Sequence, residues 1–173
     1  MSLSYDELEN LARSSEQFRS FIDPDASDFS AHGDLIDKIK AYCKKTNQPV
    51  PLTIGQIVRC IYESLVMKYR LALEQISECA QKNFEVLNLV GGGSKDRFLC
   101  ELASESIGIP VIAGPVEATA LGNIMLQLIA LGEIKDVDEG RKIIAETENV
   151  KLFNKKRRAE WDVAYKRFCE IIS

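Results

Sequence analysis

The sequence predicts an α/β fold that is mainly helical and contains a small parallel sheet. Two short apolar runs, at 84–90 and 110–114, have the length and the flanking turn residues of buried strands. They enclose one amphipathic helix, and this order forms a βαβ unit with parallel strands and a right-handed crossover. Helix signals fill most of the remaining chain. The predicted fold is therefore one βαβ unit within a helical chain.

Capping signals mark the helices in the first half of the chain. SYDE at 4–7 and TIGQ at 53–56 each place a hydroxyl residue three positions before Glu or Gln, which is the capping-box pattern. Apolar residues then recur every three to four positions and predict one long helix over 54–81. A shorter helix is expected over 34–44, and the turn-rich segment 18–33 is expected to be irregular.

Caps and stop signals also delimit the helices in the second half. Ser94 is the expected N-cap of the helix between the two strands, and Gly132 is expected to end a helix over 117–131. DVDE at 136–139 is expected to cap another helix. The last helix is expected over 155–171, with Trp161, Ala164, Tyr165, Phe168 and Ile172 on its buried face.

The composition is that of one globular domain. The 173 residues suffice for a sizeable core, with 46% apolar and 28% charged residues. A net charge of -4 and an isoelectric point near 5.2 give no reason to expect nucleic acid or an anionic membrane as the partner. The one basic run, KKRR at 155–158, is expected to be a solvated helix face.

The sequence gives no sign of a targeting or membrane segment. The start, MSLSYDELEN, is acidic and lacks the apolar core of a signal peptide. The most apolar long window, 109–131, contains prolines, glycines and polar side chains, which argues against a membrane span. A cytoplasmic location is therefore expected.

The metal-ligating residue types do not form a recognisable site. The five cysteines show no C-x-x-C spacing and His32 is the only histidine, so a zinc site is not expected. The aspartates of the segment 18–33 lack the glycine and the terminal glutamate of an EF-hand loop, and they favour turn and capping roles. The cysteines are expected to be reduced and buried, with a disulfide between Cys43 and Cys60 left open as the alternative.

Two parallel strands are too few to stand as a sheet. Parallel strands occur in sheets that are covered on both faces. We therefore expect the remaining strands to belong to a part of the protein outside this sequence. The strand 84–90 then has an open edge with apolar side chains such as Val86 and Leu89, and the chain is expected to self-associate through it.

Three consecutive glycines, Gly91, Gly92 and Gly93, separate the first strand from the following helix. Such a turn lets backbone amides approach a ligand, and the helix dipole favours an anion there, such as a nucleotide phosphate. The spacing matches neither G-x-x-x-x-G-K-[ST] nor G-x-G-x-x-G. Nucleotide binding and a tight strand-to-helix turn therefore remain alternative interpretations of the glycines.

A resemblance to a known family favours the nucleotide. The stretch GGGSKDRFLCELASESIGIPVIAGPVEATALGN resembles the carboxy-terminal part of the FGGY carbohydrate kinases. FRSFIDPD, TNQPVPLTIGQIVRCIYESLVMKYR and the closing WDVAYKRF are similar to the same family, so the resemblance spans nearly the whole chain. AGPVEATALGN is most similar to the branch that phosphorylates L-rhamnulose. The resemblance identifies 1–173 as part of the family's carboxy-terminal domain, without the catalytic amino-terminal domain.

The resemblance implies part of the second domain of an actin-like ATPase fold, which is ribonuclease H-like. In this family the sugar and ATP meet between two domains, and an aspartate acts as the base on the sugar hydroxyl that attacks the γ-phosphate of Mg-ATP. That base, the phosphate loops and the main magnesium contacts are expected outside this sequence, so no catalytic or metal-ligating residue is assigned. The chain alone is expected to be inactive, because phosphoryl transfer needs a closed cleft.

The resemblance also assigns the adenine-nucleotide site to Gly91, Gly92, Gly93 and Asp96, with Gly92 as the direct contact. Asp96 departs from the asparagine that related kinases often have beside the adenine. A carboxylate only accepts hydrogen bonds, so Asp96 suits the adenine amino group but not the ring nitrogen. Three further polar residues are interpreted as helix caps rather than ligand groups: Ser94, Glu117 and Thr119.

Three functional hypotheses follow, and the first two come from different classes. The first is the ATP-side part of a sugar kinase that phosphorylates L-rhamnulose when complete. The alternative is a standalone helical protein-interaction module derived from a kinase domain. A third alternative, an unrelated nucleotide-binding domain, is disfavoured by the length of the resemblance.

Overall fold

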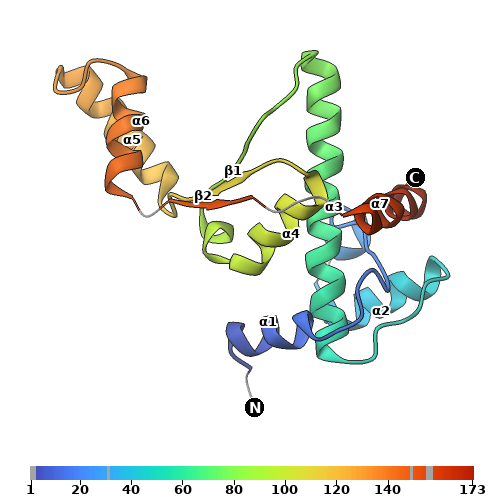
Figure 1. The fold of residues 1–173 in the computed structure, drawn as a ribbon. Helices are drawn as coiled ribbons and strands as arrows, with labels where there is room; N and C mark the ends of the chain where they lie inside the picture. Colours follow the sequence, from blue (N-terminus) through green and yellow to red (C-terminus); the bar gives the residue numbers. More distant parts are fainter. Residues whose placement is uncertain (1–2, 31, 149, 155–157) are drawn as a thin grey trace. The chain divides into compact units, whose positions relative to one another are not determined.

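The computed structural model describes residues 3–30, 32–148, 150–154 and 158–173 (Figure 1). The chain divides into two compact units. The helical unit is drawn from 1–82 and 157–173, and the sheet unit comprises 83–156. Three residues of the predicted basic helix start, 155–157, lie outside the described residues.

Helices build the described part of the helical unit. They are α1 (Tyr5–Arg13), the 3₁₀ turn η1 (Ser27–Phe29), α2 (Leu35–Lys45), α3 (Ile54–Ala80) and α7 (Ala159–Ile172). Both predicted capping boxes are confirmed by reciprocal hydrogen bonds, between Ser4 and Glu7 at α1 and between Thr53 and Gln56 at α3. The helices predicted over 34–44 and 54–81 are confirmed to within one residue at each end.

Helix α1 packs closely on the start of α3. Gly55 permits the approach, because a Cβ atom at this position would lie 2.5 Å from the carbonyl oxygen of Leu11 and 2.6 Å from the Oγ of Ser15. Both distances are far below van der Waals contact. Any side chain at position 55 would therefore push α1 away from α3.

The segment 18–25 is irregular, as predicted, and side chains of α3 hold its backbone. The amide of Phe18 donates to Oε2 of Glu63 over 2.7 Å. The amide of Ile22 donates to Oγ of Ser64 over 2.9 Å. These two side chains accept the hydrogen bonds that backbone carbonyls would accept in a helix or a sheet, so both amides are satisfied.

The aspartates at the end of this segment have two roles. Oδ1 of Asp23 accepts a hydrogen bond from the amide of Asp25 over 3.1 Å, which confirms the predicted turn role. Lys68 of α3 forms ion pairs with both carboxylates, at 2.8 Å to Asp23 and 3.0 Å to Asp25. The pairing fixes the end of the segment on the same helix that binds its start.

A charged pair lies inside the helical unit. Glu63 is fully buried, and Nε of the buried Arg59 donates to its Oε1 over 2.5 Å. Burial raises the pKa of Glu63 above its ordinary value, and the neighbouring Arg59 opposes this shift. Nothing in the sequence pattern distinguishes this pair from a solvated i,i+4 pair, so it was not predicted.

Helix α7 contributes aromatic side chains to the core. The predicted burial of Trp161, Ala164, Tyr165 and Phe168 is confirmed, whereas Ile172 is half-buried. The ring of Trp161 is fully buried and meets the ring of Phe18 edge-on, with 4.8 Å between centroids. The described helix begins at Ala159 rather than at residue 155, and 155–157 lie outside the described residues.

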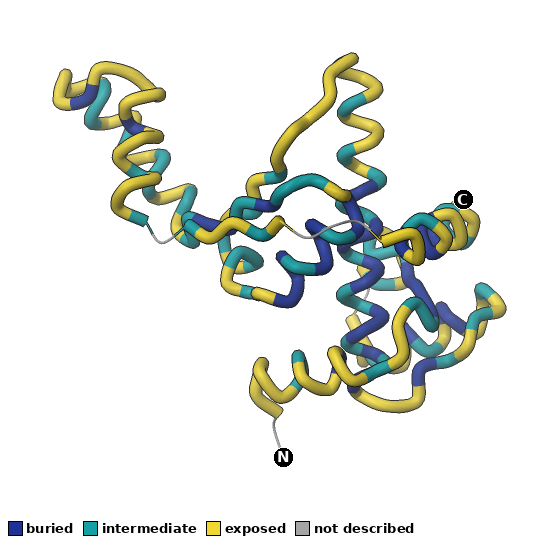
Figure 2. Tube along the Cα trace, viewed as in Figure 1, coloured by how far each residue is buried: buried dark blue, intermediate teal, exposed yellow. Residues whose placement is uncertain are grey.

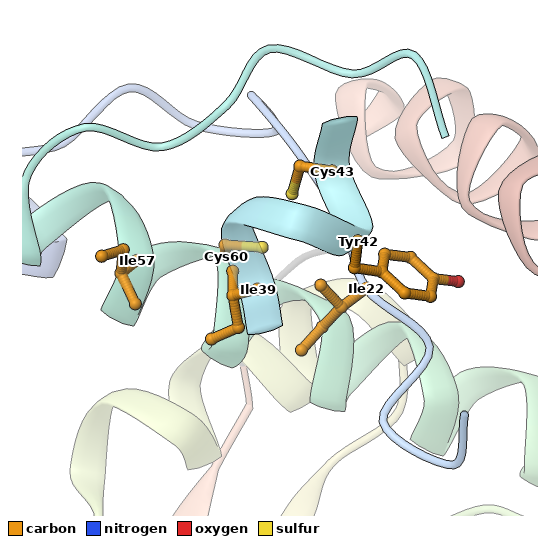
Figure 3. Packing of buried hydrophobic residues seen from close by; sticks show 6 residues of the cluster. All are labelled: Ile22, Ile39, Tyr42, Cys43, Ile57 and Cys60. Atoms are coloured by element: carbon orange, nitrogen blue, oxygen red, sulfur yellow. The ribbon is translucent and has the colours of Figure 1, made fainter. Parts of the chain in front are cut away.

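Cys43 of α2 and Cys60 of α3 meet in a hydrophobic cluster (Figure 3). Both are free thiols and both are buried, as predicted, whereas Cys79 is exposed and Cys169 is half-buried, so the prediction of burial is wrong for these two. A hydrogen bond between the two thiols lowers the pKa of Cys43 and raises the pKa of Cys60. The other residues of the cluster are Ile22, Ile39, Tyr42 and Ile57.

The sheet unit contains the predicted βαβ arrangement and one further strand. Its elements are β1 (Leu87–Leu89), the 3₁₀ turn η2 (Gly92–Lys95), α4 (Arg97–Ile107), β2 (Val111–Ala113), α5 (Ala118–Leu131), α6 (Val137–Thr147) and β3 (Lys151–Phe153). The sheet order is β1-β2-β3. The pairing of β1 with β2 is parallel, as predicted, but β3 pairs antiparallel with β2. The sheet is therefore mixed, and β3 was not predicted.

The first strand is shorter and more exposed than predicted. The run 84–90 was expected to be one buried strand, but β1 covers only Leu87–Leu89 and none of its residues is buried. Phe84, Val86 and Val90, which flank it, are all exposed. Among the described residues β1 pairs only with β2, so its apolar side chains lack the second neighbour that would cover them.

Helix α5 follows the prediction for 117–131, and Gly132 ends it in a left-handed conformation with φ of 77°. It packs against α6, whose N-cap Asp136 accepts from the amide of Glu139 as predicted. None of its residues is buried, although the helix has no charged residue. Figure 2 shows exposed colouring mixed with intermediate colouring along α5. An uncharged, unburied helix is unusual in a folded protein.

Candidate functional site

The candidate site is formed by the loops at the carboxyl ends of β1 and β2. Gly91 to Gly93 follow β1, and Gly114 and Pro115 follow β2 with a cis peptide bond between them. The amide of Gly114 donates to the carbonyl of Leu89 over 2.9 Å, and the amide of Gly91 donates to the carbonyl of Pro115 over 3.2 Å. Ligands of open α/β sheets bind at this end of the parallel strands.

The three glycines differ in what restricts their positions. Gly91 has φ of 76° and ψ of -158°, a region that is almost restricted to glycine. A Cβ at Gly93 would lie 3.2 Å from Cδ2 of Leu89, so packing restricts this position. Gly92 is exposed, and a Cβ there would meet nothing within 4 Å. Neither the space around Gly92 nor its φ explains the absence of a side chain.

Ser94 does not cap the following helix, which corrects the prediction. Its Oγ donates to the carbonyl of Gly91 over 2.7 Å within the η2 turn. The N-cap of α4 is Asp96, whose Oδ1 accepts from the amide of Leu99 over 2.9 Å. The hydroxyl at position 94 is two residues too early, because the η2 turn intervenes. One carboxylate oxygen of Asp96 is therefore engaged by the backbone.

The expected caps at the start of α5 are also corrected. Glu117 occupies the N-cap position, but its side chain makes no capping hydrogen bond. Thr119 lies inside the first turn of the helix, where a residue cannot be the N-cap. The start of α5 is therefore not closed by the side chain of its N-cap residue, and it lies directly after the loop that contacts Gly91.

Cys100 lies behind the glycine loop and is not a reactive thiol. It is buried in α4, and its Sγ is 3.9 Å from the carbonyl oxygen of Gly93. Burial raises the pKa of Cys100 to about 11, and nearby Asp96 adds to the shift. A thiol with so high a pKa is protonated at neutral pH, so it supports the loop by packing and is no nucleophile.

The described residues contain neither a metal-ion cluster of His, Cys, Asp or Glu side chains nor a membrane-spanning helix. Within 3–30, 32–148, 150–154 and 158–173, no group of three or more His, Cys, Asp or Glu side chains is placed to hold a metal ion. Over the same residues, no helix combines the length and apolarity that crossing a membrane requires.

The stability contribution of Asp96 is testable. Replacing Asp96 with alanine removes the N-cap of α4 and is expected to lower the free energy of unfolding by about 0.5–2 kcal/mol. Asparagine caps as well as aspartate, so Asp96→Asn is the control and is expected to stay close to the parent. Urea unfolding followed by circular dichroism measures both. Equal stability of the alanine variant and the parent would contradict the capping role.

Sequence comparison places the chain among sugar kinases. It matches the FGGY family of carbohydrate kinases, C-terminal domain, over residues 2–131. It is 44% identical over 165 residues to a rhamnulokinase from Bacteroides thetaiotaomicron, covering 95% of this chain and 34% of that protein. A rhamnulokinase from Bacillus subtilis is 35% identical over 153 residues, covering 88% of this chain and 32% of that protein. The chain spans about a third of the length of these curated relatives.

Solved structures show the same fold. A xylulose kinase from Lactobacillus acidophilus matches with a TM-score of 0.65 at 16% identity, over 97% of this chain and 34% of that chain. A gluconate kinase from the same organism matches with a TM-score of 0.53 at 19% identity, over 70% of this chain and 25% of that chain. The described fold is thus part of an actin-like ATPase fold, as the family resemblance implied. The chain belongs to the FGGY family of carbohydrate kinases.

Proposed function

We propose that this chain is the ATP-side part of a sugar kinase. In the complete kinase the γ-phosphate of ATP is transferred to L-rhamnulose, giving L-rhamnulose 1-phosphate. The family match and the two rhamnulokinase relatives support the reaction class and the sugar. A cytoplasmic location accords with such a substrate and remains part of the proposal.

The observation that carries the nucleotide part of the proposal is the open space at Gly92. A glycine needed for backbone conformation has a positive φ, as Gly91 does. A glycine needed for packing has atoms close to the position of a Cβ, as Gly93 does. Gly92 has neither property. A ligand lying against the peptide of Gly92 would require that residue 92 has no side chain, because a Cβ would occupy the ligand's place. We therefore assign Gly91, Gly92 and Gly93 to the adenine-nucleotide site.

Asp96 fits this site only in part. Oδ1 of its carboxylate accepts from Leu99, so the adenine amino group would share a carboxylate already used by the helix. An asparagine would keep the cap and add a donor for an adenine ring nitrogen. The Asp96→Asn variant is therefore expected to bind adenine nucleotide more tightly than the parent chain.

The residues of this chain do not suffice for phosphoryl transfer. About two thirds of each curated relative has no counterpart in the chain. We propose that this remainder supplies the catalytic base, the other phosphate contacts and the main ligands of Mg²⁺. This chain's own contribution is to hold the adenosine side of Mg-ATP, which supplies the transferable phosphoryl group.

Paired glycine substitutions test the nucleotide site. Gly92→Ala is expected to leave the stability unchanged and to abolish ATP binding, because the added methyl group blocks only the ligand. Gly91→Ala is expected to cost about 1–3 kcal/mol of stability, because alanine is strained at this φ and ψ. NMR titration of the parent with ATP should shift the amides of Gly91 to Asp96 first, with a millimolar dissociation constant, about -4 kcal/mol. Shifts that cluster elsewhere, or that persist in Gly92→Ala, would refute the site.

The isolated chain is expected to show no kinase activity. A coupled assay with Mg-ATP and L-rhamnulose should give the rate of the buffer control, since the chain carries no assigned base. Turnover that rises in proportion to the amount of purified chain would contradict this expectation. The Gly92→Ala variant is the matched control, because any true turnover must fall with it.

A second candidate function is a protein-interaction module derived from a kinase domain. The unburied α5 favours it, since such a helix needs a partner to cover it. The interaction module would be supported over the kinase part by two results together. A protein partner would bind α5, and ATP would leave the NMR signals of the Gly91 to Gly93 amides unchanged.

A further inference from the structure

A pocket lies between the first turns of α4 and the strand β3. Helix α4 packs against both β2 and β3. The pocket has a volume of about 490 Å³, which is within the usual range for small-molecule sites. Its lining residues, which we call the α4–β3 pocket, are Arg97, Glu101, Lys151, Leu152, Phe153 and Asn154. The proposed nucleotide site uses none of them.

The α4–β3 pocket and the glycine loop lie at different strands of the sheet. The sheet order is β1-β2-β3, and the glycine loop follows β1, whereas β3 forms a wall of the pocket. The strand β2 therefore lies between the two strands concerned. Arg97 follows Asp96 directly in the chain, but Asp96 does not line the pocket. A ligand in the pocket need not displace a nucleotide at the loop.

The charged side chains of the pocket are two cations and one carboxylate, which gives a net charge of +1. The carboxylate is already paired, because Oε1 of Glu101 accepts from Nε of Arg97 over 2.9 Å. The side chain of Glu101 is 12% exposed and that of Arg97 is 76% exposed. The pair uses only Nε of the guanidinium, so the two terminal nitrogens of Arg97 keep donors for a further acceptor.

Lys151 contributes the second cation from the opposite wall. It pairs with Ala113 in the register of β3 with β2, so it lies at the carboxyl end of β2. Burial raises the pKa of the Cys100 thiol in α4, and the charge of Lys151 opposes this rise, which shows that Lys151 lies near the helix. Within the described part of the chain, no hydrogen bond or ion pair engages its ammonium group. A helix and a strand thus each supply one cation with unused donors.

These donors suit a phosphate group better than a carboxylate. The terminal nitrogens of an arginine can bind two oxygens of one group side by side, and a lysine can donate to a third. A phosphate monoester offers three terminal oxygens and about 1.5–2 negative charges at neutral pH. A carboxylate offers two oxygens and one charge. Leu152 is 66% exposed and Phe153 is half-buried, so both can contact an uncharged organic part.

We propose that the α4–β3 pocket binds a small phosphate monoester, with Arg97 and Lys151 holding the phosphate and Leu152 and Phe153 contacting the organic part. This site goes beyond the proposed function and does not depend on it. The phosphates of ATP are not its ligand, because the nucleotide is assigned to the loop that follows β1.

NMR titration of the chain with phenyl phosphate tests the pocket. The amides of Arg97, Glu101 and 151–154 are expected to shift. Lys151→Gln and Arg97→Gln are each expected to weaken binding about fivefold. Both side chains are exposed, so these variants are expected to stay folded. Lys142→Gln removes an exposed charge from α6, outside the pocket, and is the matched control with unchanged affinity.

Two comparisons test the chemistry and the separateness of the site. Benzoate carries the same ring with a single charge and is expected to bind about fivefold more weakly than phenyl phosphate. Lys151→Gln is expected to leave the ATP titration of Gly91 to Asp96 unchanged. A loss of ATP affinity in this variant would assign the cation to the phosphates of the nucleotide and would overturn the separate site.

The other contrary outcomes are equally specific. Absence of phenyl phosphate binding, shifts outside the pocket, equal weakening by Lys142→Gln, or equal affinity for benzoate would each overturn the phosphate site. Failure of the proposed nucleotide site is distinguishable from these results. It shows as absent ATP shifts at Gly91 to Asp96, while phenyl phosphate still shifts the pocket amides in the parent and in Gly92→Ala.

Discussion

Replacing Glu63 with alanine is expected to lower the free energy of unfolding by about 3–5 kcal/mol. The substitution leaves the guanidinium of Arg59 buried without its carboxylate, and it deprives the amide of Phe18 of its acceptor. Both groups then lose this carboxylate, and leaving a buried charge less well compensated costs more than the lost attraction alone. Urea unfolding measures the change. The fluorescence of Trp161 is a suitable probe, because its ring packs on Phe18.

Two further variants separate the causes of this loss. Glu78→Ala, at an exposed position on the same helix, is expected to stay within about 0.5 kcal/mol of the parent. The double variant Arg59→Met with Glu63→Leu removes both charges and is expected to recover part of the stability, though not the Phe18 hydrogen bond. A Glu63→Ala protein as stable as Glu78→Ala would contradict the buried pair.

Replacing Trp161 with alanine is expected to cost a similar amount, about 3–5 kcal/mol. Its side chain is fully buried, so its removal forfeits a large apolar area and leaves a cavity beside Phe18. Trp161 is the only tryptophan, so unfolding of this variant has to be followed by circular dichroism. Chemical unfolding in urea gives the difference from the parent.

The control for this prediction lies two positions further along the same helix. Val163 is 72% exposed, and Val163→Ala is expected to change the stability by less than about 0.5 kcal/mol. A Trp161→Ala variant that unfolds at the parent's urea concentration would show that α7 does not contribute the core described for it. Equal losses for both variants would instead indicate a general weakness of the helix.

Sequence reasoning succeeded where local interactions decide the structure. The capping boxes at Ser4 and Thr53 use groups within four residues of each other, so the sequence contains all that the cap needs. The left-handed stop at Gly132 is equally local. The strand β3 depends instead on its pairing with β2 across the α5–α6 pair, and its three residues carry no pattern of their own. Such long-range pairing cannot be read from a three-residue segment.

The candidate site shows the same division. That Gly91, Gly92 and Gly93 form a turn between a strand and a helix was predictable, because their order along the chain determines it. The different requirements at the three positions were not, since they depend on φ and on the distance to Leu89. The cap at Asp96 was missed because the 3₁₀ turn η2 displaces the helix start from Ser94. The buried Arg59–Glu63 pair was missed because burial of a charge depends on distant segments.

The hydrogen bonds that join the two loops connect the proposed nucleotide site to the start of α5. The amide of Gly91 donates to the carbonyl of Pro115, three residues before α5 begins, so the glycine loop is in direct contact with the segment that leads into that helix. By reciprocity, the factor by which occupancy of α5 changes the affinity for nucleotide equals the factor by which nucleotide changes the affinity at α5. Under the proposed function, the affinity of this chain for ATP would therefore report how completely its apolar helix is covered.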